Sequence, residues 1–295
     1  MKLLGAYKNG NYKVYMFDDG TKIRANKLSS LNPVFPESID MKISNRCDMG
    51  CPMCHEQSVP DGELADLSHP ILDSLHPFTE LAFGGGNVLE HPDLNPFLKK
   101  MSDKGVLCNL TVHLHHYIKA YDRLVSLSKR KLIHGLGVSV SEPLSEPLAS
   151  SIAKFPNAVV HVIAGVVTQE TLESMYDRDM KLLILGYKNY GRGENYLTNH
   201  PSVNEQINKL KDLLPELSKH FALISFDNLA LEQLEVKQFV PEEAWEMGYM
   251  GEDGQFTMYI DLVKEEYAVS STSPRKPLTQ DNIDDVFADI KVQRQ

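Results

Sequence analysis

Apolar runs of strand length alternate with helical patterns after residue 38, and this alternation limits the possible folds more than any other feature. The strand-like runs cover residues 39–44, 80–83, 106–112, 136–140, 158–167 and 181–185. Helical patterns lie between several of them, at residues 95–104, 117–129 and 170–178. Such alternation is typical of βαβ units and of a parallel sheet. We predict an α/β fold whose core, residues 38–200, is a partial TIM-like (β/α)6 barrel.

The segment before this core, residues 1–37, has a different pattern. Strand-forming residues are separated there by Asn9-Gly10 and Asp19-Gly20, dipeptides that favour tight hairpin turns. We therefore predict a small N-terminal antiparallel β-meander.

The segment after the core, residues 201–295, begins with an amphipathic helical pattern over residues 202–220. Short strands follow, with a predicted hairpin around Asp253-Gly254 and a closing helix over residues 283–290. We predict an α+β extension that caps the barrel.

The charge balance narrows the choice of partners. The chain of 295 residues has 30 Lys and Arg against 40 Asp and Glu, a net charge of −10. An acidic balance argues against a protein that clamps a nucleic-acid backbone. The polar start and the lack of a long apolar run predict a cytoplasmic protein without a membrane segment.

Three of the four cysteines, Cys47, Cys51 and Cys54, lie within eight residues, directly after the first predicted core strand. In TIM-like barrels, catalytic groups follow the carboxyl ends of strands. Thiolates are the usual ligands of iron–sulfur clusters. A [4Fe–4S] cluster normally takes four ligands, so the spacing C-x3-C-x2-C leaves one iron open to a cofactor or substrate.

Two other interpretations of these cysteines stay open. One is a zinc site that adds His55, although adjacent Cys54 and His55 would have difficulty reaching the same tetrahedral ion. The other is a group of unliganded thiols. The fourth cysteine, Cys108, lies inside a predicted strand and is expected to be a small core residue.

A run of glycines, Gly84, Gly85 and Gly86, ends the second predicted core strand and is followed by Asn87. Glycines allow the backbone to approach a ligand closely. By itself a triple glycine is also common in ordinary turns.

Together these motifs resemble the radical S-adenosylmethionine (SAM) superfamily over about residues 38–190. The resemblance implies an enzyme in which the three cysteines hold a [4Fe–4S] cluster and the open iron chelates the methionine moiety of SAM. One electron from an external reductant then cleaves SAM, and the resulting 5′-deoxyadenosyl radical abstracts hydrogen from the substrate.

The resemblance also assigns cofactor contacts, with departures from the family pattern. Met53 stands where an aromatic residue usually precedes the third cysteine. The glycine run resembles the GGEP-type motif, but Asn87 replaces its glutamate and offers an amide without a negative charge. Ser139 stands where the family has a serine that contacts the cofactor.

Other candidates are polar residues near the ends of predicted strands or, for His161, inside one; a histidine in a strand is more often a structural residue than a functional one. They are His113, His161, Lys188, Tyr190 and Arg192. The last three are our preferred substrate contacts.

The order of elements in the tail is similar to the SPASM or twitch domains of peptide-modifying members of the superfamily. No cysteine follows Cys108, so the tail cannot carry a cysteine-bound auxiliary cluster. This similarity favours a peptide or protein side chain as substrate. The alternatives are a small metabolite or nucleoside as substrate, and a non-enzymatic barrel with a structural metal.

Overall fold

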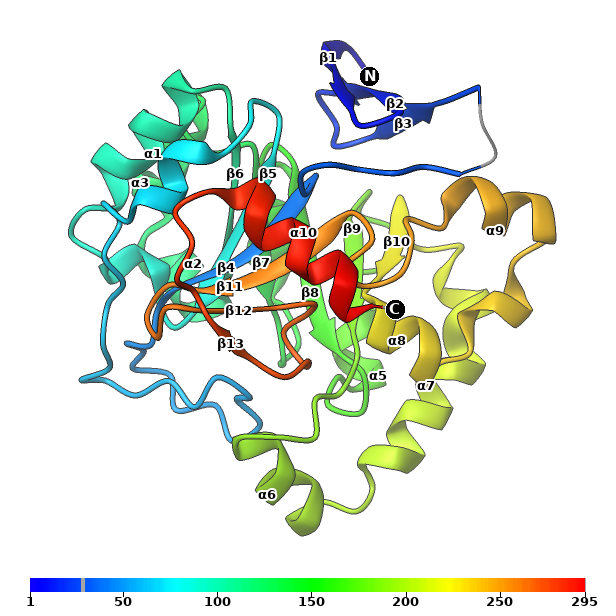
Figure 1. The fold of residues 1–295 in the computed structure, drawn as a ribbon. Helices are drawn as coiled ribbons and strands as arrows, with labels where there is room; N and C mark the ends of the chain where they lie inside the picture. Colours follow the sequence, from blue (N-terminus) through cyan, green and yellow to red (C-terminus); the bar gives the residue numbers. More distant parts are fainter. Residues whose placement is uncertain (28–29, 295) are drawn as a thin grey trace.

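The computed structural model describes residues 1–27 and 30–294, and its centre is a sheet of ten strands (Figure 1). The six predicted core strands are all present and run parallel to one another. They are β4 (Ser38–Ser44), β5 (Glu80–Gly85), β6 (Leu107–His113), β7 (Gly135–Ser139), β8 (Ala158–Ile163) and β9 (Lys181–Leu185). The predicted α/β fold with a barrel-like parallel sheet is therefore confirmed.

Two further parallel strands extend this set, one at each side. Strand β10 (Leu223–Phe226) pairs with β9, and β11 (Thr257–Asp261) pairs with β4. In the described residues β10 and β11 do not pair with each other, so the sheet stays open.

Beyond β11 the sheet continues with two short antiparallel strands, β12 (Glu266–Ala268) and β13 (Lys276–Pro277). The predicted hairpin around Asp253-Gly254 is wrong, because that turn precedes β11 and joins no pair of strands. The hairpin pairs β11 with β12 instead, and Glu265 in its turn has the positive φ of 52° that such turns require.

Helices cover the outer face of the sheet, and Figure 1 shows α1 and α3 on one side and α7 and α8 on the other. The α-helices are α1 (Leu94–Asp103), α2 (Leu114–Lys119), α3 (Tyr121–Lys129), α4 (Glu146–Ala153), α5 (Gln169–Glu173), α6 (Arg192–Asn199), α7 (Val203–Leu217), α8 (Asn228–Gln233), α9 (Glu242–Gly248) and α10 (Ile283–Gln293). Three 3-10 helices are η1 (Pro70–Ser74), η2 (Val88–Glu90) and η3 (Val236–Phe239). The predicted amphipathic helix is confirmed as α7 and the closing helix as α10.

Strand alternation decides which side chains enter the core and which face the inside of the sheet. In β4, Ile39, Met41 and Ile43 point outward and are buried against the helices. The residues between them, Asp40 and Lys42, face inward. Because successive side chains of a strand point to opposite faces, a single register places an apolar layer outside and polar groups inside.

The inner face is only partly filled, because several inward positions carry little or no side chain. These positions are Ala82 and Gly84 of β5 and Ser139 of β7. A TIM barrel normally fills its interior with bulky branched residues. Here the small residues leave space for a cavity.

The predicted N-terminal meander is confirmed as the antiparallel strands β1 (Leu3–Asn9), β2 (Tyr12–Phe17) and β3 (Lys22–Ala25). It packs on the rest of the chain through Tyr12 and Val14, which contact Phe256. Figure 1 places it at one end of the sheet, with α6 at the opposite end. Among the described residues, no helix has both the length and the apolar character that a membrane span requires.

A buried ion pair between Arg24 of β3 and Glu37, directly before β4, connects the meander to the sheet. The Arg24 Nε atom lies 3.0 Å from Glu37 Oε1, and only 1% of the Glu37 side chain is exposed. The Tyr12 hydroxyl donates to the same carboxylate over 2.5 Å.

We predict that Arg24→Ala lowers the free energy of unfolding by roughly 3 kcal/mol, because it leaves a buried carboxylate without its cation. The exposed pair Lys99–Asp103 provides the control. Lys99→Ala should cost no more than about 0.5 kcal/mol. Urea unfolding of the two variants measures both values, and equal effects would contradict the role given to Arg24.

Candidate functional site

The cavity inside the sheet has a volume of about 530 Å³. Its walls come from the inner faces of the parallel strands, from the loop after β4 and from the C-terminal segment around β11 and β12. All three clustered cysteines, Cys47, Cys51 and Cys54, line it from the loop after β4. The structure thus brings the motif to the carboxyl end of the first core strand, as the sequence predicts.

These thiols are half-buried and none of them forms a disulfide. Burial raises the pKa of Cys47 and of Cys51 above the ordinary value of a thiol. The loop that carries them is held by its own backbone: the Cys47 N–H donates to Val59 O over 2.8 Å, and the Cys54 N–H donates to Cys51 O over 3.2 Å. A bound metal cation would lower the pKa of these thiols and favour the thiolate form.

Arg192, at the start of α6, fastens this loop. Its Nε donates to Cys51 O over 3.0 Å, and its NH1 donates to Ser58 O over 3.0 Å. The Arg192 backbone N–H also donates to Cys54 O over 3.2 Å. Arg192 lines the cavity, but in this structure its guanidinium is committed to loop carbonyls.

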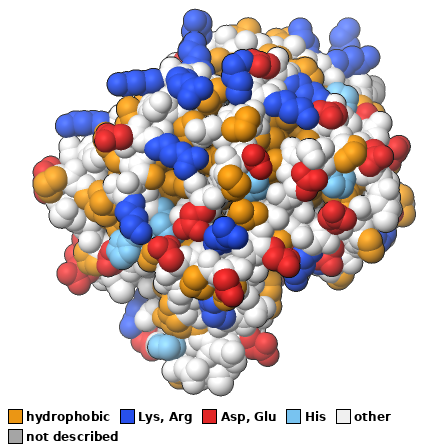
Figure 2. All heavy atoms as spheres, turned by 90° about the vertical axis from the view of Figure 1, so that its left-hand side faces the viewer, with side chains coloured by type: hydrophobic (Ala, Val, Ile, Leu, Met, Phe, Trp, Pro, Cys, Tyr) orange, Lys and Arg blue, Asp and Glu red, His pale blue; other side chains and the backbone are white. Residues whose placement is uncertain are grey.

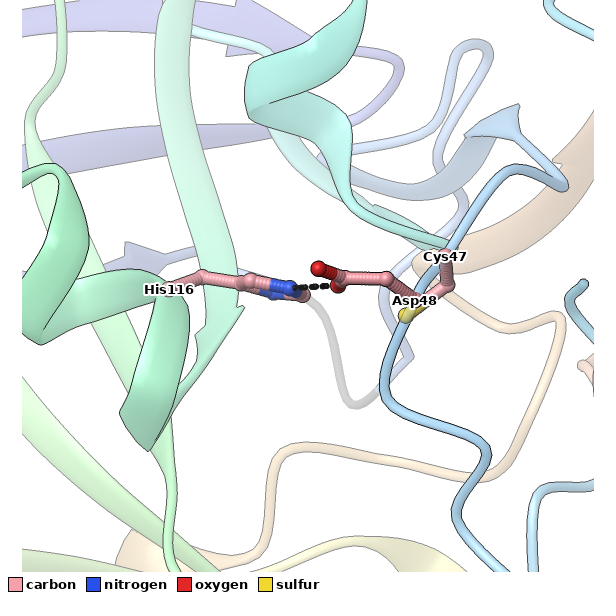
Figure 3. Close-up of side chains that lie close together, drawn as sticks. All are labelled: Cys47, Asp48 and His116. Atoms are coloured by element: carbon pink, nitrogen blue, oxygen red, sulfur yellow. Dashed lines mark hydrogen bonds and ion pairs between the residues drawn. The ribbon is translucent and has the colours of Figure 1, made fainter. Parts of the chain in front are cut away.

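A second anchor joins the loop to α2 and is shown in Figure 3. His116 Nε2 lies 2.7 Å from Asp48 Oδ1, and the His116 side chain is buried. The sulfur of Cys47, a carboxylate oxygen of Asp48 and a ring nitrogen of His116 lie within 4.8 Å of one another. Among the described residues, these three form the group of His, Cys, Asp or Glu side chains that is close enough to bind one metal ion. The three thiols with His55 do not form such a group, so the geometry does not favour the zinc interpretation.

Sequence reasoning missed the pair of Asp48 and His116. A signal was present, because Asp48 lies inside the cysteine motif and His116 follows directly on a strand end. Nothing in the sequence shows that the two meet, since they are 68 residues apart.

The glycine run forms the neighbouring wall. A Cβ on Gly84 would meet no protein atom within 4 Å, so this position faces open cavity. Gly85 has a φ of +99°, and a Cβ there would overlap the carbonyl oxygen of Ser44. Gly86, Met53 and Ser139 also line the cavity.

Asn87 lies outside the cavity lining. Its Oδ1 accepts from the Leu89 N–H over 3.2 Å and so caps η2, and its Nδ2 donates to Glu90 Oε1 over 3.0 Å. Its backbone N–H donates to Arg46 O over 2.6 Å. Asn87 therefore joins the glycine run to the cysteine loop, and its side chain is engaged locally.

Lys42 organises the wall between the cysteine loop and the C-terminal segment. Its ammonium is almost fully enclosed and lies 2.9 Å from Glu56 Oε2 and 3.2 Å from Asp261 Oδ2. Burial acts to lower the pKa of Lys42, but the two carboxylates outweigh it and raise that pKa. The Tyr259 hydroxyl also donates to Glu56 over 3.2 Å.

The two remaining preferred substrate contacts meet the C-terminal segment. Lys188 Nζ donates to Ser271 Oγ over 2.7 Å and lies 3.4 Å from His55 Nε2. The Tyr190 hydroxyl donates to Ser271 O over 2.5 Å. Lys188 lines the cavity, whereas Tyr190 is not part of its lining. Ser271 lines it too, so the C-terminal segment covers the same space as the cysteines.

The candidate histidines His113 and His161 both line the cavity, but they differ in their partners. The His113 Nδ1 accepts from the His115 N–H over 3.2 Å and so caps α2. In the described residues no group hydrogen-bonds to the ring of His161. Burial lowers the pKa of His161 to about 4, so its imidazole is neutral near pH 7.

On the face shown in Figure 2, Lys and Arg side chains are most numerous in the upper half, and Asp and Glu side chains are scattered among them and toward the right and below.

A scan against protein-family models finds no match, and a search of curated proteins finds none either. Among solved structures, the chain is similar to SuiB of Streptococcus suis bound to the precursor peptide SuiA, with a TM-score of 0.58, 13% identity and 87% of this chain covered. SuiB bound to S-adenosylmethionine gives the same three values, and a further SuiB structure gives a TM-score of 0.55 at 14% identity.

The likeness establishes a common fold. The match covers 65% of the SuiB chain in the peptide complex and 66% in the other two structures, so this chain spans about two thirds of SuiB.

We predict that Arg192→Ala frees the cysteine loop. It removes two charge-assisted hydrogen bonds to loop carbonyls, which together contribute about 2–4 kcal/mol. Cys51 and Cys54 of the metal-free protein should then react faster with a thiol reagent such as DTNB. Arg178→Ala, which removes the exposed pair with Glu146, is the control and should leave the rate unchanged. Equal rates in both variants would contradict the anchoring role.

Proposed function

We propose that the protein is a radical SAM enzyme in which Cys47, Cys51 and Cys54 hold one [4Fe–4S] cluster. The observation that carries this proposal is the placement of the three thiols on one loop at the carboxyl end of β4, facing an internal cavity. The fold shared with SuiB, a protein solved with S-adenosylmethionine, supports it.

The residues present fit this pair of cofactors. The donor set is three thiols, the ligand type of iron–sulfur clusters, and it leaves one coordination position for a further ligand. Space beside the thiols is kept free by Gly84, where even a methyl group would stand in open cavity. When bound, the cluster and SAM would together supply one-electron reduction of the sulfonium and a carbon-centred radical for hydrogen abstraction.

The protein's own contribution is to hold and enclose these groups. Arg192 and the pair of Asp48 and His116 hold different residues of the cysteine loop. In the proposal Met53, Ser139 and the glycine run contact SAM from the cavity wall, and Asn87 fixes the backbone between the glycine run and the cysteine loop. Ser271 and Tyr259 help to exclude water from the C-terminal side.

We further propose that the substrate is a peptide or protein side chain. The support is twofold: SuiB has been solved with a precursor peptide, and the C-terminal segment lines the cavity beside Lys188. His113, His161 and Lys188 are the proposed contacts to it. An external one-electron reductant is part of this proposal.

We predict that Cys51→Ala abolishes both cluster loading and reductive SAM cleavage. Anaerobic reconstitution of the unaltered chain should give roughly four irons per chain. Cys108→Ala is the matched control, because Cys108 is buried in β6 and burial raises its pKa to about 12. Iron content and 5′-deoxyadenosine formed with dithionite measure the two effects. A Cys51→Ala protein that still makes 5′-deoxyadenosine, or a chain that takes up a single zinc, would overturn the proposal.

Gly84→Val tests the cofactor pocket. The new side chain has room, so the melting temperature should stay within a few degrees, but it occupies cavity beside the thiols. SAM affinity should therefore fall by at least about tenfold, or 1.4 kcal/mol. Gly248→Val, at the end of α9, also meets no atom within 4 Å and serves as the control. Unchanged SAM affinity in Gly84→Val would remove the glycine run from the site.

A further inference from the structure

One group in the cavity has no part in the site described so far. Asp40 lies on the inner face of β4, two residues before Lys42, and lines the cavity. In the described residues its carboxylate takes part in no hydrogen bond or ion pair. The Asp40 side chain is exposed to the cavity, so its charge is accessible to a ligand.

Two more carboxylates line the same cavity from the side where β10 and β11 fail to pair. Asp227, at the end of β10, accepts from the Gly186 and Ala230 N–H groups through Oδ1, each over 2.8 Å. Asp253 accepts from the Asn228 amide over 2.7 Å. Both are held by neutral donors, so neither negative charge is balanced by these bonds.

The three carboxylates lie near enough to influence one another. Burial raises the pKa of Asp40 above its ordinary value, Lys188 opposes this shift, and the negative charges of Asp227 and Asp253 add to it. Lys188 is bonded to Ser271, and Lys42 is paired with Glu56 and Asp261. Among the described residues no cation forms an ion pair with these three carboxylates, although Lys188 acts on Asp40 at longer range.

An independent observation at another strand also points to a ligand. The His161 ring projects into the cavity from β8, beside Gly137, where a Cβ would overlap the imidazole. Neither ring nitrogen has a partner in the described part of the chain. A neutral imidazole offers one donor and one acceptor, and a ligand in the cavity could use either.

We propose that this part of the cavity, with Asp40, Asp227, Asp253 and His161, is a subsite for a basic group of the substrate, a guanidinium or a primary ammonium. The inference rests on the proposed function and adds a substrate class to it: a peptide that presents an arginine or lysine side chain. The bound cation would supply the charge and donors that the carboxylates lack, and the imidazole would accept one further hydrogen bond.

SAM also carries a cationic group, and the thiols, the glycine run and Asp40 line the same cavity. Asp40 precedes the end of β4 by four residues, which is about 13 Å along a strand. We assign its charge to the substrate, and SAM affinity is measured beside probe binding to separate the two cations.

The test uses two probes of the same shape and different charge, N-acetyl-arginine amide and N-acetyl-citrulline amide. Each is titrated calorimetrically into the full chain loaded with cluster and saturated with SAM. We expect the arginine probe to bind at least about tenfold more tightly, since hydrogen bonds to charged groups exceed neutral ones by this much. In Asp40→Asn the preference should fall to about twofold or less, while SAM affinity stays the same.

Asp93→Asn is the matched control, because Asp93 is exposed at the start of α1 and its side chain makes no capping bond. It should keep the full preference. Asp40→Asn should melt at the same or a higher temperature, since an ionised carboxylate with a raised pKa costs folding free energy. Asp253→Asn keeps the oxygen that accepts from Asn228 and provides a second variant, which should also reduce the preference.

Three results would overturn the proposal: equal binding of the two probes, absence of saturable binding of the arginine probe, or an undiminished preference in both Asp40→Asn and Asp253→Asn. Loss of SAM affinity in Asp40→Asn would assign the carboxylate to the cofactor instead. Iron content and SAM cleavage are measured on the same samples, and the probe titrations are repeated on metal-free protein. Failure of the cluster assignment therefore stays distinguishable from failure of the subsite.

Discussion

The interaction on which the site depends is the enclosed ion pair of Lys42 with Glu56 and Asp261. It joins the first core strand, the end of the cysteine loop and β11, three segments that are far apart in the sequence. An ammonium withdrawn from water is stable only when its partners stay in place, and losing one of them is costly. The cysteine loop and the C-terminal segment are thus tied to the same point of the sheet, and the cavity between them has fixed walls.

The other requirement is empty space inside a parallel sheet. Eight parallel strands with bulky inward side chains would close over a packed core. Here β5 and β7 turn Ala82, Gly84 and Ser139 inward, and in the described residues the two outermost parallel strands do not pair with each other. The polar groups that enter this space fall into two sets: one anchors the cysteine loop, and the other, Asp40 and His161, has no hydrogen-bond partner among the described residues. In our proposal a ligand binds to the second set.

The parts of the fold that could be predicted are those with a local signal. Each of the six core strands is an apolar run, helical patterns lie between several of them, and α7 repeats its apolar residues at helical spacing. Strands β10 and β11 have no comparable signal: β10 has four residues, and β11 is placed by parallel pairing with a strand more than 200 residues earlier. For the same reason the turn at Asp253-Gly254 predicted a hairpin, although its neighbours had partners elsewhere.

The sequence by itself determined the cluster of thiols and its position after the first core strand, because both depend only on spacing and on one strand signal. It also determined that Gly84 and Gly85 would end the second core strand. Only the tertiary structure decided which side chains reach the cavity. The Asn87 side chain caps η2, and the Arg192 guanidinium donates to carbonyl groups of the cysteine loop. Asp48 of that loop pairs with His116 of α2. Orientation across 68 or more residues depends on how the strands pack, and no local pattern carries that information.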